Sequence, residues 1–369
     1  MTDYKLRFFD KTGALRREVV NFLPLSYTRE VNAPGICTFW LAGDHPIWSE
    51  IEDKWQLELW RRPSGSEWYV DFVGIYRALV YEHVEQSNGK MVLPGLMDML
   101  NWRIVDFPAG TANKSVFTSA AAETVANTIV KYNCTTDATT ANGRGRAGAA
   151  GYPFTGLSVE ADGAGGNTIE HYCAYQNVLK TLVDIAAKGG GDFDIVKTSA
   201  TAWQWRWYVG QLGEDLSADI VFSLQRGNMT NVHFEEDQRG TATVAIVGGQ
   251  GEEDARLTRR VASDEYAVDN DIEVFINATD IAGEDSTAEN GLDDRGEQKL
   301  EEVRAKPVFD FDVIQTPACQ YGVDYDLGDL VTAINPRTEG SVTMKIMRVI
   351  VSLEANGEEK ISVEMAVMG

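Results

Sequence analysis

The residues best suited to nucleophilic chemistry are a histidine and a cysteine two positions apart, His171 and Cys173, separated by Tyr172. Side chains two apart on a strand point to the same face, and a cysteine nucleophile needs a base beside it. The surrounding sequence offers no identifiable oxyanion group or third partner. A Cys-His peptidase therefore ranks third among the possible functions, and a partly buried histidine next to a free thiol is the preferred interpretation.

Carboxylates are abundant, with 56 Asp and Glu residues in the chain. A glycosidase needs two of them facing each other across a cleft, which spacing along a sequence does not show. Because so many acidic residues become neighbours by chance, solvated surfaces are the preferred interpretation. Three groups are especially dense: Glu235/Glu236/Asp237, Glu252/Glu253/Asp254 and Asp324/Asp326/Asp329. The third of these groups also lacks the glycine and the distal glutamate of an EF-hand loop.

Three tryptophans alternate along one predicted strand, at Trp203, Trp205 and Trp207. A row of aromatic rings on one face stacks well on sugars, but aromatic side chains also anchor cores and subunit interfaces. A core or interface role is the preferred interpretation. The main rival function is nevertheless a carbohydrate-binding or glycoside-hydrolysing β-protein, which draws on the nine tryptophans and the many carboxylates.

The sequence predicts no catalytic residue, no cofactor site and no metal site. The cysteines lie far apart without the C-x-x-C spacing of zinc sites, so free buried thiols in a reducing cytoplasm are expected. The glycine-rich stretch 248–251 lacks the Lys-Ser/Thr of a phosphate-binding loop, and a tight strand exit is expected there. The cysteines are Cys37, Cys134, Cys173 and Cys319, and the glycine-rich stretch is Gly248-Gly249-Gln250-Gly251. The histidines His45, His83 and His233 are isolated in the sequence.

Charge and composition exclude several classes of function. The formal net charge is −23 over 369 residues, and a polyanionic surface repels nucleic acid, so sequence-specific nucleic-acid binding is not expected. No apolar run approaches the roughly 18 residues of a membrane-spanning helix, so membrane insertion by this chain is not expected. A chain of this length favours two to four domains.

At the start of the chain, apolar and polar positions alternate, and this pattern indicates strands. Six or seven strands within residues 1–94 predict an antiparallel β-barrel or sandwich. Gly74 is expected to bend or bulge the longest of them. The predicted strands are 4–9, 15–20, 26–31, 36–41, 54–61 and 68–82, with a short helical turn at 45–48.

Residues 95–215 are predicted to form an α+β insertion. It contains helices at 96–103, 119–131 with Ser119 as N-cap, and 177–188, followed by strands at 193–197 and 202–209. The third helix is amphipathic, and an exposed loop rich in Thr, Ala and Gly is expected at 135–151. The expected inward side chains of the third helix are Val178, Leu179, Leu182, Val183 and Ile185.

The remaining chain is predicted to be β again. Residues 216–262 supply strands that complete or link the barrels, and 263–305 form a mixed segment with a charged helix at 292–305, in which Leu300 and Val303 point inward. Residues 306–369 then form a second barrel. Its strongest feature is a hairpin between 342–353 and 360–367 across Asn356-Gly357, a favoured turn dipeptide.

Five stretches, in this order, resemble the tail-hub proteins of siphovirus-type phages, which are related in fold to the T-even baseplate hub. The resemblance is a pattern of turns and strand edges that spans nearly the whole chain. The stretches are SYTREVNAPG at 26–35, PGLM to WRIV at 94–105, FSLQRGN at 222–228, residues 241–256 with GGQGE, and QTPACQYGVDYDLGDLV at 315–331.

This resemblance implies a non-enzymatic structural protein of the virion, at the tail tip, assembled in the host cytoplasm. It implies a mainly β fold with two tube-like barrels per chain, so that a homotrimer forms a pseudo-hexameric ring that continues the tail tube. The implied partners are the distal tail protein, the tape-measure protein and a tip or fibre protein. Genomic DNA would pass through without specific binding, and acidic residues that line the channel would keep it from adhering.

Overall fold

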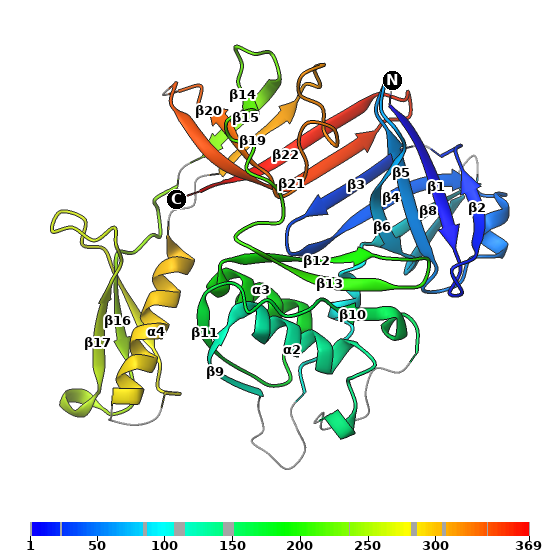
Figure 1. Cartoon of the computed structure of the whole chain (residues 1–369). Coiled ribbons are helices and arrows are strands. Elements are labelled where there is room, and N and C mark those ends of the chain that lie inside the picture. Colours follow the sequence, from blue (N-terminus) through cyan, green and yellow to red (C-terminus); the bar gives the residue numbers. More distant parts are fainter. Residues whose placement is uncertain are drawn as a thin grey trace. The chain divides into compact units, whose positions relative to one another are not determined.

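The computed structural model describes residues 2–22, 24–83, 87–106, 115–142, 151–235, 237–281, 286–304, 308–337 and 339–368. The fold is mainly β, with few helices (Figure 1). The chain divides into two compact units, unit 1 (Met1–Val232 and Asp310–Gly369) and unit 2 (His233–Phe309).

Unit 1 begins with a four-stranded antiparallel sheet in the order β2-β1-β5-β6. Its inner face is built by period-two alternation: Leu6 and Phe8 of β1 lie opposite Leu59 and Leu57 of β5, and all four are fully buried. The strands are β1 (Asp3–Phe9), β2 (Leu15–Val19), β5 (Gln56–Arg62) and β6 (Tyr69–Ile75).

The largest sheet has ten strands, most of them in the path β15-β19-β22-β21-β3-β4-β8-β7, while β20 pairs with β21 and β14 pairs with β20. The strands are β3 (Leu25–Glu30), β4 (Ala33–Ala42), β7 (Ala78–His83), β8 (Ser87–Pro94), β14 (Val221–Phe222), β15 (Met229–Glu235), β19 (Val308–Val313), β20 (Leu330–Ile334), β21 (Ser341–Leu353) and β22 (Glu359–Val367).

The first and last parts of unit 1 are joined at the centre of this sheet. β3 pairs antiparallel with β21, so that Tyr27 lies opposite Val351 and Arg29 opposite Val349. Strands from both predicted barrels therefore share one sheet. Within the described residues no sheet closes on itself, because each strand order ends at a free edge. The part of the chain that the structure describes thus forms open sheets, not the closed barrels that were expected.

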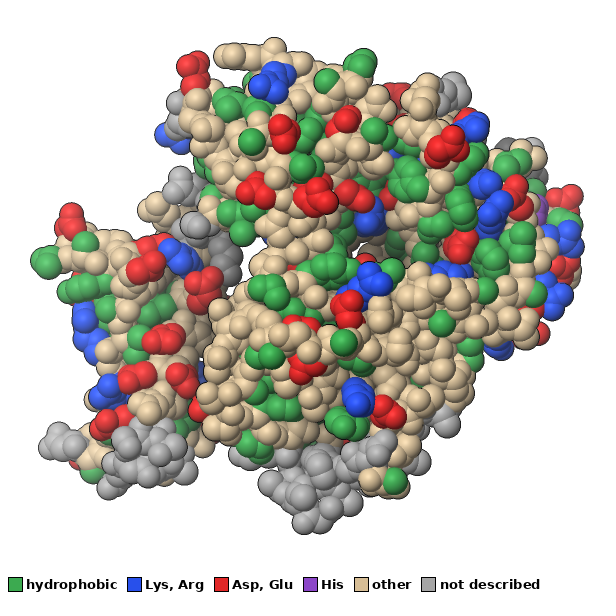
Figure 2. Space-filling view, in the orientation of Figure 1, with side chains coloured by type: hydrophobic (Ala, Val, Ile, Leu, Met, Phe, Trp, Pro, Cys, Tyr) green, Lys and Arg blue, Asp and Glu red, His purple; other side chains and the backbone are tan. Residues whose placement is uncertain are grey.

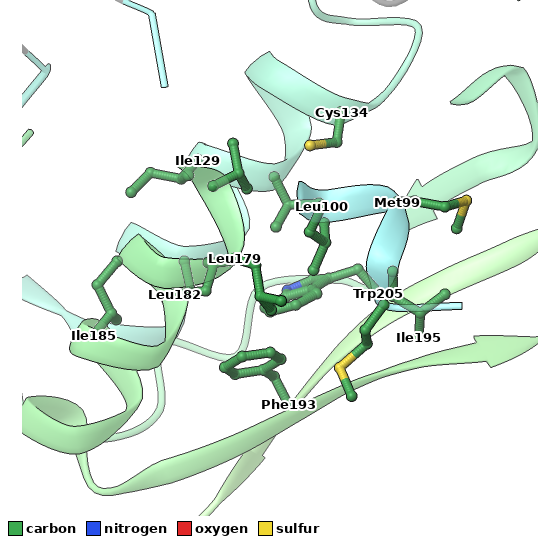
Figure 3. Close-up of a cluster of buried hydrophobic side chains, with 14 of the residues drawn as sticks. Met99, Leu100, Ile129, Cys134, Leu179, Leu182, Ile185, Phe193, Ile195 and Trp205 are labelled. Atoms are coloured by element: carbon green, nitrogen blue, oxygen red, sulfur yellow. The ribbon is translucent and has the colours of Figure 1, made fainter. Parts of the chain in front are cut away.

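Residues 95–215 contain both helices and strands. Two small sheets, β10-β13-β12 and β11-β9, pack with helices α2 and α3 around one core (Figure 3). In Figure 3, Phe193 and Trp205 from the sheet point toward Leu179 and Leu182 of α3. The elements are α1 (Asp98–Asn101), β9 (Ser115–Ala121), α2 (Ala122–Cys134), β10 (Leu157–Val159), β11 (Thr168–Cys173), α3 (Val178–Gly189), β12 (Gly191–Lys197) and β13 (Trp203–Val209).

Helix ends follow local chemistry. Asn177 caps α3 by accepting the N–H of Lys180 at 3.1 Å, and Gly190 ends it in the left-handed conformation that glycine adopts without strain. The predicted N-cap Ser119 of α2 was wrong, because Ser119 lies in β9 and Ala121 occupies the cap position. The α2 side chain Glu123 instead binds the nearby N–H groups of Gly163 and Gly165.

Two further predictions need correction. The strand expected at 68–82 is two strands, β6 and β7, which belong to different sheets; β8 then pairs with β7. Val183, expected inward on α3, is 40% exposed, whereas the other four predicted positions are buried. Of the loop predicted at 135–151, residues 143–150 lie outside the described part. Short 3₁₀ turns are η1 (Pro46–Ser49, as predicted near 45–48), η2 (Thr140–Asn142) and η3 (Phe154–Gly156).

Unit 2 is a three-stranded sheet with one helix packed on it. The strands are β16 (Val244–Gly248), β17 (Thr258–Ala262) and β18 (Glu273–Asn277), joined by η4 (Glu253–Ala255) and followed by α4 (Ser286–Val303). Leu292 and Leu300 of α4 pack on Ala245 and Val247 of the sheet, and Val303 packs against the same cluster, as predicted for Leu300 and Val303. Gly296 permits this approach, because a Cβ there would lie 2.6 Å from Val261.

Candidate functional site

The histidine and cysteine that suggested a peptidase lie in a packed core. Both point inward from β11, whose burial alternates strictly, and only 7% of His171 and 3% of Cys173 is exposed. Burial raises the pKa of the Cys173 thiol to about 11 and lowers the pKa of His171. The thiol is therefore protonated at neutral pH beside a neutral imidazole, the opposite of an activated pair. All four cysteines are free and buried, as predicted.

The tryptophan row belongs to the core and does not form a sugar platform. Trp203 and Trp205 are fully buried and Trp207 nearly so. The Trp205 indole donates to Oδ1 of Asn127 on α2 at 2.9 Å, and its ring lies 4.8 Å from that of Phe193. The core interpretation is confirmed, and stacking on sugars is ruled out for these three rings.

The acidic groups separate into two kinds. Glu235, Asp237, Glu252 and Glu253 are exposed, as predicted for solvated faces; Glu236 and the side chain of Asp254 lie outside the described residues. In the third group Asp329 is buried, whereas Asp324 and Asp326 are partly exposed, and each of the three carboxylates accepts hydrogen bonds within unit 1. Among the described residues no group of three or more His, Cys, Asp or Glu could hold a metal ion.

The glycine-rich stretch after β16 is a strand exit, as predicted. Gly251 has a positive φ of 101°, and the Arg256 side chain donates to the carbonyls of Gly248 and Gly249 at 3.2 Å each. These contacts direct carbonyl oxygens, rather than N–H groups, toward the Arg256 guanidinium. A phosphate cradle requires the reverse.

The remaining histidines stand apart from one another. His45 accepts the Ile47 N–H at 3.2 Å and so caps η1. His233 is exposed on β15, and the side chain of His83 lies outside the described residues. None of the helices in the described ranges combines the length and apolar character that crossing a bilayer requires.

The most elaborate polar arrangement was not anticipated from the sequence. It is a partly buried cluster around Arg29 of β3, which donates to Asp71 at 3.0 Å and to Asp326 at 2.6 Å. Asp71 also accepts the hydroxyls of Tyr27 and Tyr321, the latter at 2.9 Å. Burial raises the pKa of both phenols far above the ordinary range, so both remain donors.

A second cation, which is buried, extends this cluster. The Arg61 side chain is 1% exposed, and it donates to the Tyr321 carbonyl at 2.7 Å and to the Tyr69 hydroxyl at 2.8 Å. It also pairs with Glu359 of β22 at 3.0 Å. We call the Arg29 and Arg61 groups together the junction cluster: Tyr4, Tyr27, Arg29, Arg61, Tyr69, Asp71, Tyr321, Asp326 and Glu359.

The junction cluster holds the sequence-distant parts of unit 1 together. Its members come from the four-stranded sheet, from β3, from the turn segment before β20 and from β22. The charges of the cluster are paired with one another; Arg61 and Asp71 are buried, while Arg29 and Asp326 are partly exposed. The geometry of the cluster fits a structural role, in which removal of one partner leaves an uncompensated charge.

Comparison with known proteins identifies the relatives of this chain. The model of the Siphovirus ReqiPepy6 Gp37-like protein family matches residues 5–365, nearly the whole chain. The chain belongs to this Gp37-like family. Among curated proteins, none matches it.

Three solved structures have the same fold as this Gp37-like protein. The 43 kDa tail protein of prophage MuSo2 from Shewanella oneidensis has a TM-score of 0.60 at 13% identity, over 99% of this chain and 98% of its own. The tail protein from Neisseria meningitidis MC58 has a TM-score of 0.58 at 10% identity, over 99% of this chain and 96% of its own. Prophage tail protein gp18 from Listeria monocytogenes EGD-e has a TM-score of 0.52 at 12% identity, over 98% of this chain and 94% of its own.

These matches confirm the resemblance at the level of family and fold. Two of the stretches that carried the resemblance meet in the junction cluster. Residues 26–35 supply Tyr27 and Arg29, and residues 315–331 supply Tyr321 and Asp326, which meet Arg29 in the folded chain.

Proposed function

We propose that this protein is the hub of a phage tail tip, a structural component of the virion that assembles in the host cytoplasm. The observation that carries the proposal is the single large sheet of unit 1, in which β3 from the start of the chain pairs with β21 from its end. That sheet lies in a fold shared over nearly full length with phage tail proteins. A rigid β-surface built from both ends of a chain suits a wall segment of a tube.

In this proposal three copies form a ring that continues the tail tube. Residues 1–94 and 306–369 of each copy supply two comparable β-regions, so that a trimer presents six. The free edges of the sheets support this arrangement, because an open edge is a template for pairing with another chain. The ring connects the distal tail protein and the end of the tape-measure protein to a tip or fibre protein.

DNA would pass through this ring without being bound. The net charge of −23 disfavours adhesion of a polyanion. The charge is unevenly distributed: residues 233–309 hold 20 of the 56 acidic residues and only eight Lys and Arg. Repulsion by the channel wall therefore depends on which faces of units 1 and 2 line it, and the proposal requires that wall to carry no net positive charge.

The protein is proposed to have no catalytic activity. The buried, unactivated Cys173 and the buried tryptophan row support this view over a peptidase or a sugar-acting protein. The rival carbohydrate function loses the tryptophan row, because those three rings belong to the core.

Electron microscopy of the purified full-length chain tests the assembly. The expected result is a particle with three-fold symmetry and an open central channel. Particles of a single chain without a channel, seen at every concentration, would refute the hub. A matched specimen of Arg61→Met shows whether assembly requires the intact junction cluster.

A further inference from the structure

The three-stranded sheet of unit 2 ends in two exposed edge strands. In the order β17-β16-β18, the outer strands β17 and β18 have five residues each. Exposure alternates in the same way along both: the first, third and fifth residues are exposed, and the second and fourth are half-buried. Figure 2 shows hydrophobic side chains exposed among acidic and basic ones on the surface of unit 2.

Backbone groups on the outer side of β18 have no partner strand. The Ala278 N–H donates to the Gly248 carbonyl at 2.8 Å, so the even-numbered residues of this segment face β16. Alternate residues of a strand direct N–H and C=O away from the neighbouring strand. Glu273, Phe275 and Asn277 therefore face the open edge, and no described residue bonds to their backbone groups.

The opposite edge, β17, is arranged in the same way. The Ser263 N–H donates to the Thr243 carbonyl at 2.9 Å, so the odd-numbered residues of β17 face β16. Thr258, Arg260 and Ala262 face outward, and their backbone groups have no bond to a described residue. An edge with free backbone groups is a template for pairing with another strand.

The side chains of β18 leave apolar surface beside its edge. Phe275 is 59% exposed, on the sheet face opposite α4. On the other face α4 lies over β16 and β17, so Val274 and Ile276 of β18 stay half-buried. A neighbouring strand that carried its own helix would cover apolar surface on both faces of β18.

The β17 strand of a second copy fits this edge in length and in chemistry. In an antiparallel alignment with the two strands centred on each other, Phe275 lies opposite Arg260 of the second copy. A guanidinium beside an aromatic ring gains cation–π attraction, and Glu273 then lies diagonal to the same arginine, within reach of a long side chain. The flanking pairs also match, since Val274 meets Val261 and Asn277 meets Thr258.

Arg260 is available for such a contact. Within its own chain it lies over the Tyr266 ring at 5.0 Å and pairs with Asp271 at 3.3 Å. Both side chains of that ion pair are more than 40% exposed, and exposed pairs contribute little. Pairing of two β17 strands would instead place Arg260 opposite Arg260, and like charges directly opposite destabilise a sheet.

We propose that unit 2 of one copy pairs edge to edge with unit 2 of a second copy, β18 of one against β17 of the next. Such a head-to-tail contact closes into a ring or continues as a filament. In the hub proposed above, on which this pairing rests for the number of copies, three sheets would join in one ring. The hub proposal itself assigns no contact to unit 2.

Double cysteine variants of the full-length protein test the pairing and its register. Thr258→Cys with Asn277→Cys places two thiols opposite each other in neighbouring copies, with Cα atoms about 5.5 Å apart, within reach of a disulfide. In one chain both residues lie opposite Gly248 on either side of β16, about 10 Å apart and too far to bridge. The native cysteines are free and buried, so they do not compete.

Two matched variants report on the alternatives. Thr258→Cys with Glu273→Cys shifts one thiol by four residues, about 13 Å along the strand. Glu273→Cys with Asn277→Cys detects pairing of β18 with β18, because those positions lie opposite each other in that dimer. After mild oxidation, non-reducing electrophoresis measures cross-linked chains, and mass spectrometry of the linked peptides identifies the cysteines.

The variant with Thr258→Cys and Asn277→Cys is expected to cross-link at least about tenfold faster than either alternative. Adding Phe275→Ser should slow it by about tenfold, since buried aromatic side chains anchor interfaces. The control Val268→Ser removes a valine that is 92% exposed and lies outside both strands, and should leave the rate unchanged. In the unmodified protein, amides of residues 258–262 and 273–277 should exchange hydrogen more slowly at high concentration than at low concentration.

Three results would overturn the pairing: no cross-link in any variant, equal cross-linking of the offset variant, or faster cross-linking between two β18 strands. Failure of the hub looks different. A trimeric ring whose unit 2 does not cross-link specifically would keep the hub and refute the pairing. Specific cross-links in open chains of copies, without a ring, would support the pairing and contradict the hub.

Discussion

Arg61 and Glu359 form a nearly buried ion pair with 3.0 Å between Nη2 and Oε1, although 298 positions separate them in the chain. Arg61 lies on β5 of the four-stranded sheet and Glu359 begins β22 of the ten-stranded sheet. The Tyr4 hydroxyl donates to the same carboxylate and accepts from Arg61 at 3.0 Å. The pair therefore fixes one sheet against the other.

Arg61→Met is expected to destabilise the protein by about 3–5 kcal/mol, because it leaves Glu359 without its charge partner in a largely buried site. The adjacent Arg62 is the matched control: it pairs with Asp3 at 2.5 Å, but both side chains are more than 40% exposed. Arg62→Met should cost less than about 1 kcal/mol. Urea denaturation of both variants measures the difference, and equal costs would refute the importance of the junction cluster.

Local structure was predictable where one short pattern decides it. The hairpin across Asn356-Gly357 formed as predicted, because a favoured turn joins two alternating strands, β21 and β22. The Asn177 cap and the strand with the tryptophan row also follow from nearby residues alone. The start of α2 at Ala122 was not predicted. The Glu123 carboxylate in its first turn binds the N–H groups of Gly163 and Gly165, which lie about forty residues away in the sequence.

Long-range pairing was not predictable from one sequence. Nothing in the residues of β3 specifies β21 as its partner, and Arg29 looks like any charged residue on an alternating strand. The junction cluster depends on Asp71 and Asp326 being brought to Arg29 by that pairing. The resemblance to tail proteins predicted the fold, which residue spacing alone did not. The closed barrels expected in each chain were not found, since the described sheets end at free edges.

Trp205→Phe is expected to cost roughly 1–3 kcal/mol, because Oδ1 of Asn127 loses its donor inside the core. Trp60→Phe removes a comparable indole bond, to Glu58 at 2.8 Å, from a half-buried position where Glu58 keeps Lys197 as a partner. Trp60→Phe should therefore lower the free energy of unfolding by less than Trp205→Phe does. Thermal unfolding followed by near-ultraviolet circular dichroism compares the two, and a larger loss in the control would contradict the core role of Trp205.

Native thiols are expected to resist alkylation. Burial raises the pKa of both Cys173 and Cys319 to about 11, and Cys37 and Cys134 are fully buried. Iodoacetamide at pH 8 should therefore modify none of the four within minutes, but all four in urea. Intact-mass spectrometry counts the adducts. Rapid modification of native Cys173 would indicate a thiolate and restore the peptidase interpretation.

Stability should fall at acid pH partly through Asp10. Hydrogen bonds from Thr12, foremost its hydroxyl, lower its pKa from 3.8 to about 2. A carboxyl whose pKa is lower in the folded state contributes stability that is present above pH 3.8 and lost as pH falls toward 2. After a discount for solvent screening, the contribution is roughly 1–2 kcal/mol.

Asp10→Asn should therefore destabilise the protein at pH 6 and flatten its stability profile between pH 4 and pH 2. Asp3→Asn, at an exposed position, is the control for the removal of a carboxylate as such. Urea midpoints at intervals of pH measure both. An Asp10→Asn profile as steep as that of the unchanged protein would show that Asp10 is not the group responsible.

The most direct test of the hub is the mass of the full-length protein in solution, measured by light scattering after size exclusion over a wide range of concentrations. One chain has a mass of 40.7 kDa. A species of three times that mass, or a larger ring-forming assembly, is the predicted result. A single-chain mass at every concentration would contradict a protein that builds a trimeric ring.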